Sequence, residues 1–248
     1  MHKPERTSIG IPPKREELYV KLYQFIDSVI DDFEPPIQDN GKNVVAEDKI
    51  TSGMSRYLNS QSRQSDDVFN FSFVNQDGPC DIGVYLGWEY DKYYKSICWI
   101  EAKRLPTPKQ ANRDEREYVF VDHSKLNKKG NKQYENNGGI ERFKLSKHGK
   151  DYPIAIMFGY VQNETFAFWE RKINEWLCIY STTFPFDTKE QLERIGNRDN
   201  RYVSIHQRID KNYQPVENIK IYHFWINLCT RENPDTNHIP HRRRIAAV

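Results

Sequence analysis

The feature that most constrains the fold is an apolar run at residues 154–161, followed closely by an amphipathic helical stripe. Strands buried on both faces belong mainly to sheets that helices cover on both sides. The stripe has helical spacing and consists of Phe166, Trp169, Ile173, Trp176, Leu177 and Tyr180. This strand-to-helix unit predicts an α/β protein with a central mixed sheet flanked by helices.

Other periodic segments supply the rest of the expected fold. A first helix is predicted over residues 18–33, after a proline pair that suits a helix start, and a second helix begins near Val45. We expect further strands over residues 68–74, 81–86, 96–103, 118–122, 202–209 and 219–228. Helical character is also expected around residues 131–134 and 140–147, interrupted by Gly138 and Gly139. The last two strands would form an additional C-terminal pair.

Length and composition indicate one soluble domain. The 248 residues divide into an N-terminal helix and linker (1–44), a core (45–180), and a C-terminal strand extension with a basic tail (181–248). No apolar run approaches the roughly 18 residues of a membrane helix, and residues 1–14 lack the apolar stretch of a secretory signal. We therefore expect a cytoplasmic protein with no membrane association.

Charge and common motifs give little direct indication of function. Thirty-seven Lys and Arg residues stand against 35 Asp and Glu residues, so any basic surface must be local. The histidines show no zinc-binding spacing; His206 and His223 could face each other across the last strand pair, although a structural role is favoured for them. No glycine-rich phosphate loop is present, so any use of ATP would fall to another chain.

Two carboxylates are predicted to lie side by side in a hairpin. With its loop centred on Asp91, antiparallel pairing places Asp81 opposite Glu101, and Lys103 follows on the same face of the same strand. Opposed like charges are destabilising unless a cation such as Mg²⁺ neutralises them. We accordingly expect that removing either carboxylate relieves repulsion in the metal-free protein. An ordinary exposed strand end with a salt bridge is the alternative.

A third carboxylate belongs to the second helix. Glu47 falls within the apolar stripe of that helix, whereas Asp48 points nearly opposite. A carboxylate that faces inward is costly unless it is paired or near a metal. Glu47 is therefore expected to join the hairpin residues, with a helix-starting acid as the alternative reading.

The order of Pro79, Asp81, Glu101 and Lys103 resembles the signature of PD-(D/E)xK nucleases, the restriction-endonuclease-like superfamily. The resemblance covers residues 45–105 best and departs where Cys80 separates the proline from the aspartate. It implies a restriction-endonuclease-like fold and a catalytic set of Asp81, Glu101, Lys103 and Glu47. It also implies that Mg²⁺ or Mn²⁺ binds to Asp81, Glu101, the carbonyl of Ala102 and Glu47.

The resemblance further implies a role for Lys103 and a substrate. Lys103 would position the attacking water, or deprotonate it if its pKa were lowered. Basic residues that follow the catalytic strand are candidate nucleic-acid contacts, with a solvated surface as the alternative: Arg104, Lys125, Lys128, Lys129, Lys132, Arg142, Lys144 and Lys147. The expected substrate is DNA, although the residues do not distinguish it from RNA.

Three functions follow from these observations. The first is a Mg²⁺-dependent endonuclease, the cleavage component of a restriction or anti-phage defence system, with homo-oligomerisation or a separate ATPase or recognition subunit left open. The second is a non-cleaving nucleic-acid-binding or assembly subunit that retains the fold and uses the acidic cluster structurally. The third is an unrelated α/β protein with a chance Glu-x-Lys match.

Overall fold

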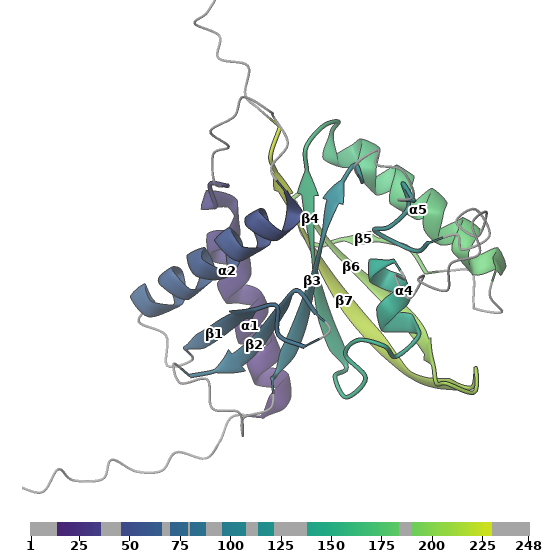
Figure 1. Cartoon of the computed structure of the whole chain (residues 1–248), viewed down its shortest axis with the longest axis horizontal. Coiled ribbons are helices and arrows are strands. Elements are labelled where there is room, and N and C mark those ends of the chain that lie inside the picture. Colours follow the sequence, from purple (N-terminus) through teal and green to yellow (C-terminus); the bar gives the residue numbers. More distant parts are fainter. Residues whose placement is uncertain are drawn as a thin grey trace, which may run out of the picture.

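The protein is an α/β structure in which one mixed sheet lies between two layers of helices, as the computed structural model in Figure 1 shows. The structure describes residues 14–35, 46–65, 70–78, 80–87, 96–107, 114–121, 138–183 and 190–229. Within these ranges no helix has both the length and the apolar character needed to cross a membrane. The predicted helix around 131–134 and the basic tail lie outside them.

The helices of the described residues lie in segments that were predicted to be helical. They are α1 (Arg15–Val29) with the 3-10 turn η1 (Ile30–Asp32), α2 (Glu47–Gln64), α4 (Gly139–Lys144) and α5 (Phe166–Thr183). The strands are β1 (Phe71–Asn75), β2 (Ile82–Leu86), β3 (Cys98–Leu105), β4 (Ile154–Val161), β5 (Glu193–Arg194), β6 (Arg201–Ile209) and β7 (Pro215–Asn227). Apart from β5, each strand corresponds to a predicted one.

The sheet has the order β1-β2-β3-β4-β7-β6-β5. The pairs β1·β2, β2·β3, β7·β6 and β6·β5 are antiparallel, whereas β3·β4 and β4·β7 are parallel. The predicted C-terminal pair is therefore present as β6 and β7. It is an integral part of the sheet, because β7 lies between β4 and β6.

Strand β4 explains why the sheet needs helices on both faces. All of its residues are buried. Ile156 and Phe158 pack with α1 and α2, whereas Ala155 and Met157 pack with α5 and β6 on the other face. Figure 1 shows α1 and α2 on one side of the sheet and α4 and α5 on the other. The apolar run thus occupies the middle of a three-layer core.

The strand predicted at residues 118–122 is wrong. Residues 115–119 form turns, in which the amide of Phe120 bonds to the carbonyl of Arg116 at 2.9 Å. The carbonyls of Glu117, Tyr118 and Val119 instead accept the first amides of α4, at 2.8 to 3.2 Å. The apolar character of this segment reflects burial in the core rather than strand pairing, because its carbonyls satisfy amides that a helix start leaves without a partner.

Candidate functional site

The hairpin register is the predicted one and leaves an open edge on β3. Ile82 pairs with Ile100 and Val84 with Cys98, as a loop centred on Asp91 requires. The ladder stops there, although β3 continues to Leu105. Residues 101–105 therefore present backbone groups on the side of β2 without a strand partner.

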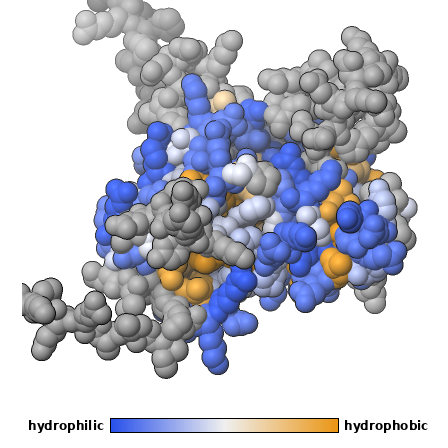
Figure 2. All heavy atoms as spheres, turned by 60° about the horizontal axis from the view of Figure 1, so that its bottom comes forward, coloured by the Kyte–Doolittle hydropathy of each residue, from blue (hydrophilic) through white to orange (hydrophobic). Residues whose placement is uncertain are grey.

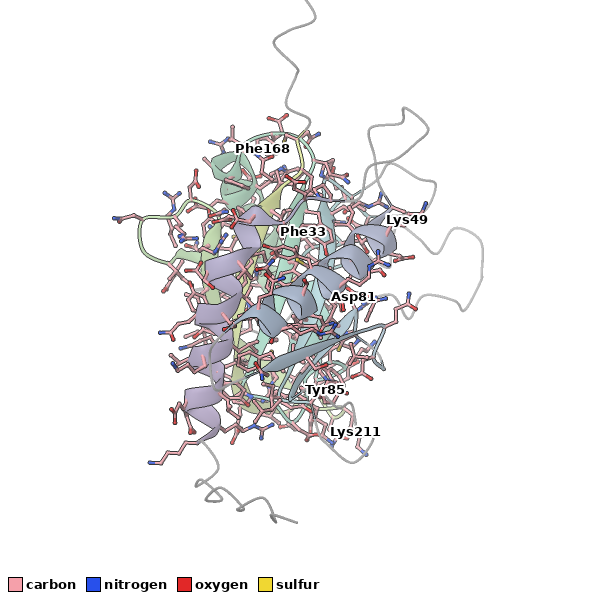
Figure 3. The ribbon with its side chains drawn as sticks, turned by 90° about the vertical axis from the view of Figure 1, so that its left-hand side faces the viewer. Phe33, Lys49, Asp81, Tyr85, Phe168 and Lys211 are labelled. Carbon is pink, nitrogen blue, oxygen red and sulfur yellow. The ribbon has the colours of Figure 1, made fainter. Side chains whose placement is uncertain are left out.

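Two of the predicted carboxylates satisfy this open edge. Asp81 Oδ2 accepts the amide of Ala102 at 2.7 Å, and Glu47 Oε2 accepts the amide of Arg104 at 3.1 Å. Alternate amides of a strand point to the same side, so both carboxylates lie along one line. Figure 3 shows Asp81 between Lys49, near the start of α2, and Tyr85 on β2. Asp81, Glu47 and β3 thus come together as the sequence predicted.

Glu101 and Lys103 lie at the centre of this arrangement. Glu101 is fully buried and Lys103 is 7% exposed. The ammonium of Lys103 is 2.7 Å from Glu101 Oε1 and 3.8 Å from Glu47 Oε1, and it donates to the carbonyl of Ala102 at 3.1 Å. One lysine cation therefore contacts oxygens of three of the four residues that were predicted to bind a metal.

Glu101 also contacts two cationic or titratable residues that sequence reasoning did not assign there. Arg142 Nη1 lies 2.5 Å from Glu101 Oε1, and His148 Nδ1 lies 3.3 Å from Oε2. Both come from α4 and the turn after it. They are more than 40 residues from Glu101 in sequence, and no local spacing relates them to the hairpin.

Close packing of the start of α4 brings these residues to the sheet. A Cβ atom on Gly138 would lie 2.3 Å from the Cα of Phe120, and one on Gly139 would lie 2.6 Å from Cε of Met157. Glu141 closes the helix start by accepting the amide of Gly138 at 2.9 Å. The glycine pair therefore begins the helix instead of interrupting it, because only glycine permits this approach.

The two hairpin carboxylates have opposite electrostatics. Burial and the nearby charge of Glu101 raise the pKa of Asp81 to about 6. Burial alone would also raise the pKa of Glu101, but Lys103, His148 and Arg142 outweigh it and lower that pKa to about 2. The expectation that both carboxylates are destabilised by repulsion is therefore wrong for Glu101, whose charge is compensated by neighbouring cations.

Lys103 is held in its charged form. Burial would lower its pKa, but the carboxylates of Glu101, Glu47 and Asp81 outweigh burial and raise the pKa above its ordinary value. A lysine can act as a general base only when its pKa is lowered. This arrangement suits the electrostatic role of Lys103 rather than the role of a base.

The oxygen atoms at this site are of the type that binds a hard divalent cation. Carboxylate and carbonyl oxygens are the ligands that Mg²⁺ prefers. Glu101 Oε2 is buried and makes no hydrogen bond of regular geometry with the described residues, although His148 Nδ1 lies 3.3 Å from it. Within the described part of the chain, however, no three His, Cys, Asp or Glu side chains form a ready-made metal cluster. Lys103, Arg142 and His148 are the residues that now surround Glu101.

The predicted nucleic-acid contacts have different outcomes. Lys144 is wrong as a surface contact, because it is 1% exposed and its ammonium pairs with Glu190. Arg104 is buried beside Glu47, whereas Arg142 is only partly buried and Lys147 is exposed. The remaining candidates, Lys125, Lys128, Lys129 and Lys132, lie outside the described residues.

A second polar cluster lies inside the sheet, next to α4. His206 bonds Glu190 through Nδ1 at 2.8 Å and Ser204 Oγ through Nε2 at 2.7 Å. The same Ser204 hydroxyl bonds His223 Nε2 at 2.7 Å, and His223 Nδ1 bonds the hydroxyl of Tyr118 at 2.9 Å. The two histidines therefore do not face each other directly but share Ser204.

The ends of this chain of hydrogen bonds fix its direction. The indole of Trp225 can only donate, and it donates to Tyr118 at 3.0 Å, whereas the carboxylate of Glu190 can only accept. With both histidines neutral, every group between them donates toward Glu190 and accepts from the side of Trp225. Burial lowers the pKa of His206 and of His223, which agrees with neutral rings.

Comparisons of the chain with protein-family models, with curated proteins and with solved structures find no match. The description of the fold and of both clusters therefore comes from this structure alone.

Proposed function

We propose that this chain is a metal-dependent endonuclease that hydrolyses phosphodiester bonds in DNA and that its cleavage centre is the open edge of β3. The observation that carries the proposal is the convergence of Asp81, Glu47, Glu101 and Lys103 along residues 101–104. The resemblance to PD-(D/E)xK nucleases and the α/β sheet support it. A role as the cleavage subunit of a restriction or anti-phage system follows from the same resemblance.

Each residue has a specific role in this proposal. Asp81, Glu101, the carbonyl of Ala102 and Glu47 would hold Mg²⁺ or Mn²⁺, which supplies Lewis-acid polarisation of the phosphate and activation of water when bound. Asp81 and Glu47 each use one oxygen to fix the backbone of β3, so their side chains are oriented before any ligand arrives. Lys103 keeps its positive charge and stabilises negative charge that develops on the phosphate.

The test is a cleavage assay on supercoiled, linear and single-stranded DNA and on RNA, in Mg²⁺, Mn²⁺ or EDTA. Asp81→Asn and Glu47→Gln should each lower the metal-dependent rate at least about 100-fold, since both remove an oriented ligand charge. Asp199→Asn and Asp48→Asn are matched controls, because both carboxylates are exposed. Wild-type rates in Asp81→Asn, or equal rates in EDTA, would contradict the proposal.

The second candidate is a non-cleaving nucleic-acid-binding or assembly subunit. A specific observation favours it: Glu101 already has Lys103 and Arg142 as partners and His148 nearby, so its charge can be explained as part of a structural ion-pair cluster. This candidate predicts nucleic-acid binding without turnover in any of the three metal conditions. The cleavage assay therefore separates the two functions.

A further inference from the structure

A pocket of about 790 Å³ lies between the turn after α4 and the β6–β7 hairpin. Its basic lining residues are Lys147, Lys150, Arg208 and Lys211, and its apolar ones are Leu145 and Val216. This volume is within the usual range for small-ligand sites, which is roughly 300 to 1,000 Å³. In Figure 3, Lys211 lies at the lower end of the molecule, below Asp81 and Tyr85.

Arg208 gives the pocket a buried positive charge. It is 4% exposed, its Nη1 donates to the carbonyls of Gly149, Lys150 and Tyr152 at 3.0 to 3.2 Å, and its Nε donates to that of Glu217 at 2.8 Å. Among the described residues it has neither an ion pair nor a hydrogen bond from Nη2. Backbone dipoles thus hold the guanidinium in place, while Glu217 and Asp151 act on its charge from beyond ion-pair distance.

The remaining charges around the pocket also favour an anion. Lys150 and Lys211 are exposed and form no ion pair with the described residues. Two acidic residues, Asp210 and Glu217, line the pocket as well. Asp210 is committed to its own turn, where it accepts the amides of Asn212 and Gln214 at 2.8 and 2.9 Å. The four basic side chains therefore outnumber the two acidic ones.

The pocket and the candidate cleavage centre share one turn of the chain. His148 contacts Glu101, while its neighbours Lys147 and Lys150 line the pocket. Two residues of extended chain span at most about 7 Å, so this part of the pocket lies near the Glu101 side of the site. In Figure 2, which brings this end of the molecule forward, the described surface is mainly hydrophilic.

We propose that this pocket binds a backbone phosphate of the nucleic-acid strand whose cleaved bond lies at β3. The assignment rests on the proposed function and adds to it a second contact that fixes the position of the strand. Arg208 supplies the fixed guanidinium, and Lys150 and Lys211 neutralise the phosphate from the rim. Leu145 and Val216 offer an apolar surface to the sugar or base.

The experiment measures binding of short labelled duplexes and single strands in EDTA, which prevents metal-dependent cleavage, between about 50 and 200 mM salt. Each lost phosphate contact lowers the salt dependence by a slope of about 0.9 on duplex DNA. For Lys150→Gln combined with Lys211→Gln, which removes the contact with this one phosphate, the loss of affinity over this salt range should be about 3.5-fold smaller than for wild type. The matched control combines Lys172→Gln with Lys220→Gln, a partly exposed and an exposed lysine that do not line the pocket, and should behave as wild type.

The alternative source of phosphate is a free one, which a thermal shift with inorganic phosphate or adenosine monophosphate detects. A wild-type shift that the pocket variant abolishes, together with an unchanged salt slope, would overturn the strand assignment. Equal slopes in wild type and pocket variant, with DNA cleavage intact in Mg²⁺, would overturn the pocket inference alone. A wild-type protein that neither binds nor cleaves nucleic acid would overturn both this inference and the proposed function. A reduced slope with no shift supports the strand contact.

Discussion

Two buried polar clusters lie in this sheet, and they differ in how completely their groups are satisfied. At β3, Glu101 Oε2 makes no hydrogen bond of regular geometry with the described residues, and the side chain of Glu47 is 16% exposed. In the chain from Trp225 to Glu190, both nitrogens of His206 and of His223 are bonded and the rings are at most 1% exposed. We call the partly exposed cluster at β3 the open cluster, and the fully bonded chain from Trp225 to Glu190 the closed cluster.

The comparison shows why the contents of a cluster do not define a site. Ser204, His206 and Glu190 have hydrogen-bond distances suited to nucleophilic catalysis, yet Ser204 is 2% exposed. A substrate would have to enter the core to reach it. The β3 cluster lacks such a familiar triad but combines partial exposure with an unsatisfied oxygen. In the proposed function, access and incomplete bonding rather than residue types therefore distinguish the β3 cluster from the second one.

The largest expected effect comes from removing the carboxylate that pairs with a buried lysine in each cluster. Glu101→Gln should lower the free energy of unfolding by about 3–5 kcal/mol, because it leaves the buried Lys103 and the partly buried Arg142 without this carboxylate. Glu190→Gln should cost a similar amount, because the buried Lys144 would lose the carboxylate that pairs with its ammonium. Asp81→Asn should leave it unchanged or raise it, because the raised pKa of Asp81 shows that the fold already disfavours its charge.

Urea unfolding in EDTA near pH 7 measures all three variants. If Glu101→Gln were as stable as wild type, the ion-pair cluster would contribute nothing to stability. If Asp81→Asn lost as much as Glu101→Gln, the contrast between the two carboxylates would be wrong.

The second prediction separates the open cluster from the closed one. Mg²⁺ or Mn²⁺ at 100 times its dissociation constant should stabilise wild type by about 2.7 kcal/mol through mass action. Asp81→Asn should lose this thermal shift, whereas Ser204→Ala should retain it because the closed chain holds no metal ligand in the proposal. Lys103→Ala should retain or enlarge it, since a competing cation is removed, and should still lose cleavage.

Differential scanning fluorimetry over a metal titration gives these shifts. A melting temperature of wild type that ignores millimolar Mn²⁺ would favour the non-cleaving scaffold. If Ser204→Ala abolished the shift, the metal would bind at the cluster of Ser204 and not at β3, which would contradict the proposal.

The third and smallest effect concerns pH and the closed cluster. Burial lowers the pKa of His206 and of His223, so the unfolded chain binds protons below about pH 6.5 that the native state does not. Stability from these neutral rings is therefore present above that pH and lost as the pH falls, by about 1 kcal/mol between pH 6.5 and 5.5 for His223, whose pKa lies well below its ordinary value. Urea unfolding at both pH values should show a smaller loss in His223→Gln than in wild type. Equal losses would mean that His223 titrates in the fold.

The sequence predicted those parts of the site that depend on local geometry. The hairpin register follows from its loop length, and the inward direction of Glu47 follows from helical periodicity. Both place carboxylates on β3 without knowledge of the rest of the chain. The α/β class likewise follows from the apolar run that became β4.

Contacts between residues far apart in the sequence could not be predicted from local geometry. Arg142 and His148 reach Glu101 only because Gly138 and Gly139 let α4 approach the sheet. The burial of Lys144 depends on Glu190, which follows 46 residues later. Charge and spacing cannot show which lysine faces solvent when the partner lies on another element. The direction of the hydrogen-bond chain likewise required the positions of strands β6 and β7.

The position of β7 has a consequence for protein synthesis. This strand is the last in the described chain, yet it joins β4 to β6 in the middle of the sheet. A growing polypeptide can form the β1–β2–β3 hairpins early, but β6 has no attachment to β4 until residues 215–227 have emerged from the ribosome. Synthesis interrupted before that point would release a chain with β5 and β6 unattached to the rest of the sheet, which quality-control proteases would recognise as unfolded.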